Sequence, residues 1–160
     1  MPEHIDLQNF LPFRLNRLST ILSRRLSELY SDKYGLDVPQ WRVIATLGHR
    51  QVCTAQSIVS ATYTHKSTIS RAVSKLVASG YVESFSSETD KREMLLRFTA
   101  LGQALYKELV PLIREVEADV IAKLGNDNYL QLQAALGTLE AALGVMPLNN
   151  ELDRFFAEEP

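Results

Sequence analysis

The sequence lacks the features that mark an exported or membrane-bound protein. Its only cysteine, Cys53, cannot form an internal disulfide, which fits a reducing compartment. No apolar run approaches the ~18 residues that a membrane span needs. The first ten residues lack the basic and apolar regions of a signal peptide. We therefore expect a cytoplasmic protein with no membrane partner.

Patterns typical of enzymes and metal sites are also missing. There is no Gly-rich phosphate loop, no His-Glu-x-x-His and no Gly-x-Ser-x-Gly. His49 and Cys53 are too few for a metal site, and His4 and His65 are far from them in sequence. Cys53 follows a short β-prone segment, where we interpret it as core filler rather than a redox sensor. We expect no catalytic residue, no cofactor and no metal.

Acidic residues are absent from one long stretch of the chain. Residues 38–82 contain no Asp or Glu, although the chain average of 19 acids in 160 residues would put about five there. This stretch carries +5, so the remainder carries −7 to give the net charge of −2. A surface that approaches phosphates has to exclude carboxylates as well as gather bases. The stretch is therefore a candidate nucleic-acid-binding surface; chance within an apolar segment is the alternative.

Helix and strand signals alternate along the chain. Leucines recur at steps of three and four before Gly35, a natural helix stop. Asp37 and Thr54 are suited to cap helices, as is Thr99. The expected helices cover residues 7–33, 37–48, 55–61, 65–80, 99–124 and 127–143, with short strands over 50–53, 81–86 and 92–98. The last helix has a heptad-like set of apolar residues, which are Tyr129, Leu132, Leu136, Leu139 and Leu143.

The helix within residues 65–80 has two contrasting faces. Its apolar stripe consists of Ile69, Ala72, Val73, Leu76 and Val77. The opposite face consists of Lys66, Ser67, Ser70, Arg71, Ser74 and Lys75. Arg and Lys side chains can read guanine edges or hold phosphates, and short Ser side chains permit close approach. This face is the candidate DNA-reading surface; an ordinary solvated helix face is the alternative.

The stretch "SSETDKREMLL", residues 86–96, places an acid directly before two bases at the tip of an expected hairpin. Lys91 and Arg92 are expected to reach the minor groove or its phosphates. Asp90 would repel phosphate, so it needs a structural reason to be there. We predict that it braces the tip by accepting hydrogen bonds from turn amides and by pairing with Arg92. A solvated loop with incidental charges is the alternative.

The element order is that of a winged helix-turn-helix: helix, short strand, helix, turn, helix and two-stranded hairpin. The fold is predicted to be mainly α with a small β-hairpin wing and long dimerisation helices. The winged helix-turn-helix DNA-binding domain is expected at 37–98, the helical dimerisation region at 7–34 and 99–144, and an acidic C-terminal tail at 145–160. The long helices carry more apolar side chains than one small winged domain can cover, which predicts a homodimer; packing within a single chain is the alternative.

Four segments carry a resemblance to a known family. They are "LPFRLNRLS", "GLDVPQWRVIATLG", "HKSTISRAVSKLVASGYVE" and "ETDKREMLLRFTALG". Over about residues 10–143 the chain resembles the MarR family of bacterial transcriptional regulators. Asp90 and Arg92 match the family's Asp-x-Arg wing motif, and Phe98, Thr99 and Gly102 match its Leu-Thr-x-x-Gly helix start. Met94 departs from the pattern, because many members have a basic residue there.

The resemblance implies a transcriptional regulator, predicted to be a repressor, that binds a pseudo-palindromic operator in double-stranded DNA as a homodimer. It also implies release by a small aromatic or anionic effector. No family motif locates the effector site. Our candidates are Arg14, Arg17, Tyr30, Trp41 and His49, with plain core or solvated roles as the alternative. A winged-helix module that binds protein instead of DNA is the alternative function. Such modules tend to expose apolar or acidic residues on the corresponding helix, and this chain does not.

Overall fold

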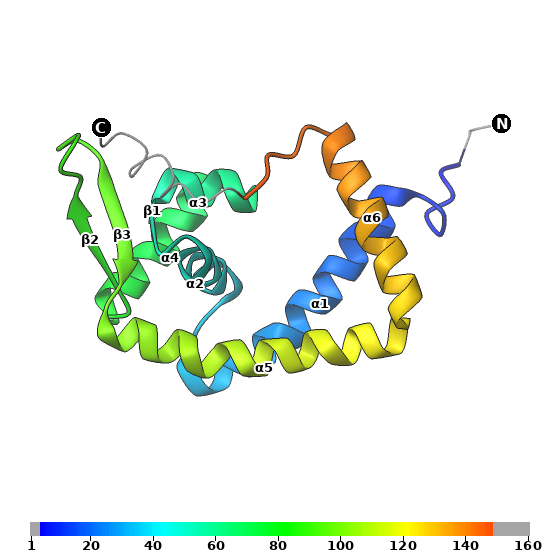
Figure 1. The fold of residues 1–160 in the computed structure, drawn as a ribbon, viewed down its shortest axis with the longest axis horizontal. Coiled ribbons are helices and arrows are strands. Elements are labelled where there is room, and N and C mark those ends of the chain that lie inside the picture. The colour runs from blue at the N-terminus through cyan, green and yellow to red at the C-terminus, as the bar shows by residue number, and fades with distance from the viewer. Residues whose placement is uncertain (1–3, 149–160) are drawn as a thin grey trace. The chain divides into compact units, whose positions relative to one another are not determined.

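The computed structural model describes residues 4–148, in two compact units that divide between Val38 and Pro39. The first unit contains helix α1, Leu11–Tyr34. The second contains the other elements (Figure 1). These are α2 (Val38–Arg50), β1 (Val52–Thr54), α3 (Ala55–Thr62), α4 (Lys66–Ala78), β2 (Val82–Ser86), β3 (Met94–Phe98), α5 (Ala100–Leu124) and α6 (Asn126–Ala142).

Helix α1 begins four residues later than the leucine pattern predicted. Pro12 lies in its first turn, where the missing N–H of proline costs no intrahelical hydrogen bond. The preceding residues form a turn in which Asp6 accepts hydrogen bonds from the Gln8 amide and the Asn9 side chain. Gly35 ends α1 in the left-handed conformation at φ 64°. Five large apolar side chains of α1 are exposed: Leu11, Leu15, Leu18, Ile21 and Leu22.

The sheet has three antiparallel strands in the order β1-β3-β2, so the expected short strand after α2 joins the expected two-stranded hairpin. The alternation of apolar residues predicted Met94, Leu96 and Phe98 on one face of β3. The structure exposes Met94 and buries both Leu95 and Leu96. Successive strand residues point to opposite faces, so both faces of β3 are covered at this level. Helices α3 and α5 both contact β3, and such packing against a sheet is what buries the side chains on its faces.

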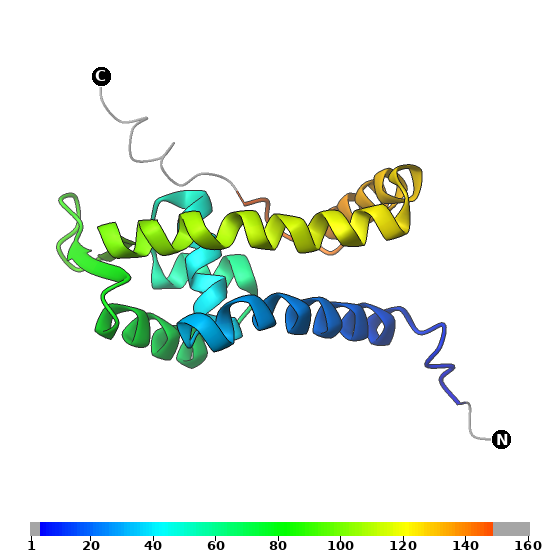
Figure 2. The same cartoon turned by 90° about the horizontal axis from the view of Figure 1, so that it is seen from below.

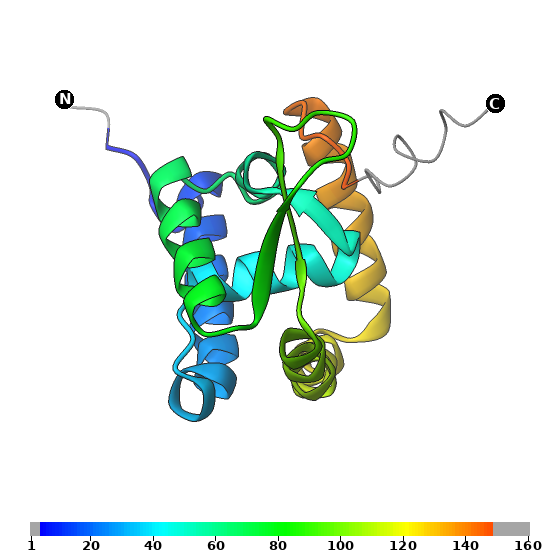
Figure 3. The same cartoon turned by 90° about the vertical axis from the view of Figure 1, so that its left-hand side faces the viewer.

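Helices α2, α3 and α4 build a helix-turn-helix core beside the sheet, and Figure 3 shows α4 next to the β2–β3 hairpin. The fully buried apolar side chains of this core include Val43, Ile44, Leu47, Ile58, Ile69 and Leu76. Thr54 caps α3 as predicted, because its hydroxyl accepts a hydrogen bond from the Ser57 amide at 3.0 Å. The mainly helical fold with a small wing is therefore confirmed.

Helix α5 leads from the wing to α6 (Figure 2). The Thr99 hydroxyl accepts from the Gly102 amide at 3.0 Å and donates to the Gly80 carbonyl at 2.5 Å. A Cβ on Gly102 would lie 1.8 Å from the Tyr81 carbonyl oxygen, so only glycine fits here. None of the helices in the described part of the chain is long and apolar enough to cross a membrane.

No residue of helix α6 is buried by the part of the chain that the structure describes. Of its heptad-like set, Tyr129, Leu136 and Leu139 are half-buried, whereas Leu132 and Leu143 are exposed. The chain leaves α6 through Gly144, which adopts a left-handed conformation at φ 68°. Of the expected acidic tail, residues 145–148 are described, and residues 149–160 lie outside the described part.

Candidate nucleic-acid interface

Helix α4 presents its polar residues to solvent. All six residues of the predicted reading face are exposed: Lys66, Ser67, Ser70, Arg71, Ser74 and Lys75. On the other side Ile69, Ala72 and Leu76 are buried. The apolar stripe is narrower than expected, because Val73 is half-buried and Val77 is 42% exposed. The face that carries bases and hydroxyls is thus open along the whole helix, and no acid lies on it.

The side chains of this face make contacts along α4 itself. The Arg71 Nε–H donates to the Ser67 carbonyl at 3.3 Å. Its other N–H groups are on Nη1 and Nη2, the fork that recognises guanine O6 and N7. The Ser74 hydroxyl donates to the Ser70 carbonyl at 3.0 Å, so its oxygen remains an acceptor toward the outside. The face therefore offers a guanidinium donor and a hydroxyl acceptor one helical turn apart.

Histidine caps the start of α4. The Ser67 amide donates to His65 Nδ1 at 3.3 Å, and the Ser67 hydroxyl lies 2.8 Å from the same nitrogen. Because Nδ1 accepts from a backbone N–H, the proton of the neutral ring is on Nε2. The cap satisfies one of the four amides that a helix start leaves without an intrahelical partner.

The turn before α4 contains residues that sequence reasoning did not single out. Tyr63 is 71% exposed and has a left-handed backbone at φ 49°. Arg42 of α2 donates from Nη1 to the Thr64 hydroxyl at 2.9 Å, and that hydroxyl donates to the Thr62 carbonyl at 3.3 Å. Arg42 thereby connects α2 to the turn that orients α4. The contact spans 22 residues, and only the +5 charge of the stretch had drawn attention to Arg42.

The wing tip is closed by hydrogen bonds around Asp90. Its carboxylate Oδ1 accepts from the Arg92 amide at 2.9 Å, and its carbonyl accepts from the Glu93 amide at 2.9 Å. The expected contact with a turn amide is present, but the carboxylate contacts the Arg92 backbone and not its guanidinium. Lys91 and Arg92 are both exposed.

Ser87 is a second part of the wing tip, which the sequence did not indicate. It is only 3% exposed, and its hydroxyl lies 3.0 Å from the Thr89 hydroxyl and 3.4 Å from the Asp90 amide. Lower on the wing, Arg97 pairs with Glu83 at 2.5 Å and lies 4.5 Å from the centre of the Phe85 ring. The Arg97 charge is thus paired with Glu83 on the strands, unlike the basic side chains of Lys91 and Arg92 at the tip.

The five effector candidates divide between the two units. Arg14, Arg17 and Tyr30 lie on α1 in the first unit: the arginines are exposed, Arg17 lies 5.6 Å from the Phe13 ring centre, and Tyr30 is buried. Trp41 and His49 lie on α2 in the second unit. They are eight residues apart, which is about 12 Å along a helix. His49 Nε2 is 3.1 Å from the Leu148 carbonyl oxygen, so it contacts the segment after α6.

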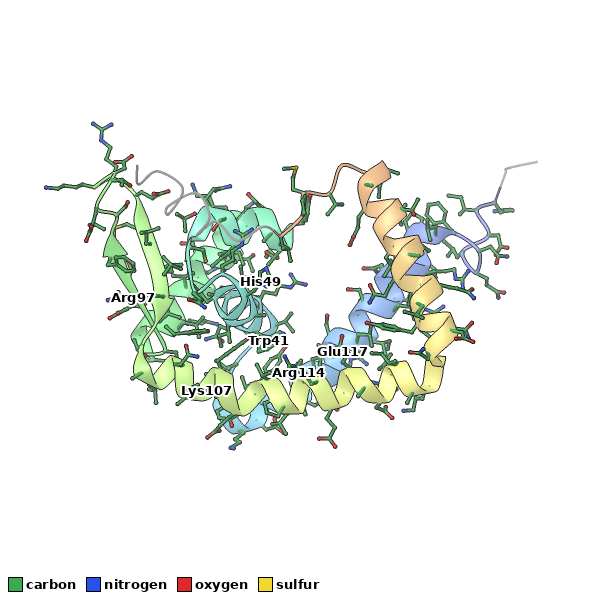
Figure 4. All side chains as sticks on the ribbon, in the orientation of Figure 1. Trp41, His49, Arg97, Lys107, Arg114 and Glu117 are labelled. Atoms are coloured by element: carbon green, nitrogen blue, oxygen red, sulfur yellow. The ribbon has the colours of Figure 1, made fainter. Side chains whose placement is uncertain are left out.

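The sequence did not single out two charged residues of α5, Arg114 and Glu117. Figure 4 shows Arg114 and Glu117 on the stretch of α5 below Trp41 in that view. Trp41 itself is half-buried. Cys53 is 1% exposed, as expected of core filler. Among residues 4–148, no group of three or more His, Cys, Asp or Glu side chains could hold a metal ion.

Two short helices joined by a tight turn, with an open basic face on the second and a hairpin after it, define a winged helix-turn-helix protein. A MarR family model matches residues 34–93. The chain is 30% identical to the HTH-type transcriptional regulator PecS of Dickeya dadantii over 132 residues, which is 81% of this chain and 79% of PecS. The chain therefore belongs to the MarR family of transcriptional regulators.

Solved structures agree with this assignment. A MarR/EmrR family transcriptional regulator from Acinetobacter sp. ADP1 has a TM-score of 0.79 and 27% identity, over 89% of this chain and 100% of that one. BpsR of Bordetella bronchiseptica, whose DNA binding is regulated by 6-hydroxynicotinic acid, has a TM-score of 0.74 and 20% identity, over 88% of this chain and 98% of its own. The second likeness concerns the fold alone.

Proposed function

We propose that this protein is a homodimeric repressor that binds a pseudo-palindromic DNA operator and is released from it by a small aromatic acid. The observation that carries the proposal is the α4 face, on which six polar or basic side chains are exposed and no carboxylate is present. It lies within the stretch that contains no acid from residue 38 to residue 82. Such a surface is built to approach phosphates and base edges.

In this proposal α4 enters the major groove. Ser67 and Ser70 permit close approach at the start of the helix, and Arg71 reads a base through its terminal nitrogens. Lys66 and Lys75, at opposite ends of the helix, bind phosphates, and Ser74 contributes a further polar contact. The Arg42 bond to Thr64 sets the turn, so α4 meets the DNA in a defined orientation.

The wing provides the second contact. Lys91 and Arg92 reach the minor groove or its phosphates. Asp90 keeps the loop that carries these two side chains ordered at the end of strands β2 and β3. The hydrogen bond from the Arg92 amide to the Asp90 carboxylate supports this role. A tip that is already ordered loses less entropy when its side chains bind.

The dimer accounts for the apolar side chains that a single chain leaves exposed. On α1 they include Leu11, Leu15 and Leu18, and on α6 they include Leu130 and Leu132. We assign residues 7–34 and 99–144 to dimerisation and residues 37–98 to DNA binding. Two winged domains bind successive major grooves when they are one helical turn, about 34 Å, or a multiple apart.

An effector that shifts this spacing would release the DNA. We propose a planar aromatic carboxylate, because the second unit offers a ring in Trp41 on α2 and a cation in Arg114 on α5, both labelled in Figure 4. Arg14, Arg17 and Tyr30 on α1 remain candidates. His49 is a weaker candidate, because it contacts Leu148. The regulation of BpsR by 6-hydroxynicotinic acid is a precedent of the same chemical class.

The decisive experiment is selection of bound sequences from a random pool of double-stranded DNA. The expected result is a motif of two inverted half-sites whose centres lie about one helical turn apart. Retention of DNA without any sequence preference, or no retention at low salt, would exclude a sequence-specific regulator. The second result would favour a winged-helix module that binds protein.

A further inference from the structure

A groove lies beside the turn that precedes the recognition helix α4. Its volume is about 380 Å³, and its walls include Val59 and Ala61 of α3, Tyr63 and Thr64 of the turn, and Met146 and Leu148 from the segment after α6. Figure 1 shows this segment crossing from α6 toward α3. The His49 ring nitrogen at 3.1 Å from the Leu148 carbonyl fixes where the segment arrives.

The described part of the chain therefore ends, at Leu148, against the proposed DNA-binding domain. Thr64, in the wall of this groove, precedes the first residue of α4 by only two positions. Leu148, the last described residue, therefore lies in a groove beside the turn that leads into α4.

The sequence of residues 149–160 complements that surface in charge. It contains four acids and one base, Arg154, for a net charge of −3. The acids are Glu151, Asp153, Glu158 and Glu159. The exposed face of α4 carries three bases, Lys66, Arg71 and Lys75, and no acid. The segment also contains Leu152, Phe155 and Phe156, apolar side chains that match the Val59, Ala61 and Tyr63 wall of the groove.

We propose that residues 149–160 dock on the groove and on the exposed face of α4, and thereby compete with DNA for the recognition helix. This inference rests on the proposed function, since the face it covers is the one assigned to DNA. Phe155 and Phe156 fill the groove, and the acids lie against Lys66, Arg71 and Lys75.

The geometry allows this docking. Twelve residues span up to about 40 Å when extended, whereas the 13 residues of α4 span only about 20 Å. A short tether gives an effective concentration in the millimolar range, so even a weak contact is populated. DNA, which has far more negative charge, displaces the segment when the operator fits. Binding to imperfect sites is suppressed, because they supply less free energy for that displacement.

The first test compares DNA affinities at low salt, by fluorescence anisotropy on one operator duplex. A chain that ends at Leu148 is expected to bind several-fold more tightly than the full chain. Loss of negative charge alone would have the same sign, so the matched variant is Phe155→Ser with Phe156→Ser, which keeps every charge. Docking predicts that this variant also binds more tightly. An affinity equal to that of the full chain would overturn the proposal.

The second test reads docking without DNA. A nitroxide attached to Ala157→Cys labels that site alone, because Cys53 is 1% exposed. Docking predicts strong broadening of the amide signals of residues 58–71 in the DNA-free full chain, and loss of that broadening in the Phe155→Ser, Phe156→Ser background. Absence of broadening refutes the docking. Broadening in a protein that binds no DNA would refute the proposed function instead, so the two failures are distinguishable.

Discussion

Replacement of Asp90 tests whether an acid at the wing tip helps or hinders DNA binding. Asp90→Ala removes the hydrogen bond from the Arg92 amide, which measures 2.9 Å and is worth about 0.5–1.5 kcal/mol. Lys91 and Arg92 then bind from a looser loop, and ordering each side chain costs about 0.5–1.5 kcal/mol. The lost repulsion acts in the opposite direction by at most about 1 kcal/mol, because exposed charges 4 Å apart interact this weakly in water. We expect a net loss of about 1 kcal/mol, or about fivefold in affinity.

Asp90→Asn is the matched control, because the side-chain amide keeps the Oδ1 acceptor and removes the charge. A fluorescence-anisotropy titration at one salt concentration should find that Asp90→Asn binds with wild-type affinity or slightly more tightly. The same titration should find that Asp90→Ala binds about fivefold more weakly. If repulsion dominated, both variants would bind more tightly than wild type. Tighter binding by the alanine variant would falsify the brace.

Three further predictions concern stability, assembly and readout. Gly102→Ala should lower the free energy of unfolding by about 1–3 kcal/mol in a denaturant melt, because the added Cβ would meet a backbone oxygen. Gly137→Ala is the control and should leave that free energy undiminished, because no atom lies within 4 Å of the added Cβ. Leu136→Glu should give monomers or insoluble protein; a soluble, folded dimer by light scattering would contradict the dimer helix assignment. Arg71→Ala should cost about 1–3 kcal/mol and relax preference at one operator position, whereas Lys75→Ala should weaken all sequences alike and lower the salt slope by about one. Unchanged affinity in both variants would refute the recognition-helix assignment.

The features that were predictable from the sequence depend on near neighbours along the chain. The two faces of α4 follow from helical periodicity, and the caps at Thr54 and Thr99 follow from residue type and position. Gly35 ends α1 for the same local reason. These are interactions across a few residues, so the pattern itself contains the information.

The features that were missed depend on contacts between distant residues or on competition between local rules. The Arg42 bond to Thr64 spans 22 residues. Leu95 and Leu96 point to opposite faces of β3 and are both buried, because elements from other parts of the second unit, among them α3, contact this strand. Periodicity within β3 alone cannot show that. The leucine pattern begins at Leu7, but α1 begins only at Leu11, because Pro12 favours a position in the first turn of a helix.

The hydroxyl of Thr99 has a mechanical consequence. It connects the turn after α4, through the Gly80 carbonyl, to the first turn of α5. Helix α5 has 25 residues and is therefore a rod about 37 Å long. A tilt of about 5° at one end of such a rod displaces the other end by about 3 Å, close to the spacing of about 3.4 Å between neighbouring base pairs. A small rotation near α6 would thus move α4, the proposed recognition helix, by about the distance between neighbouring base pairs.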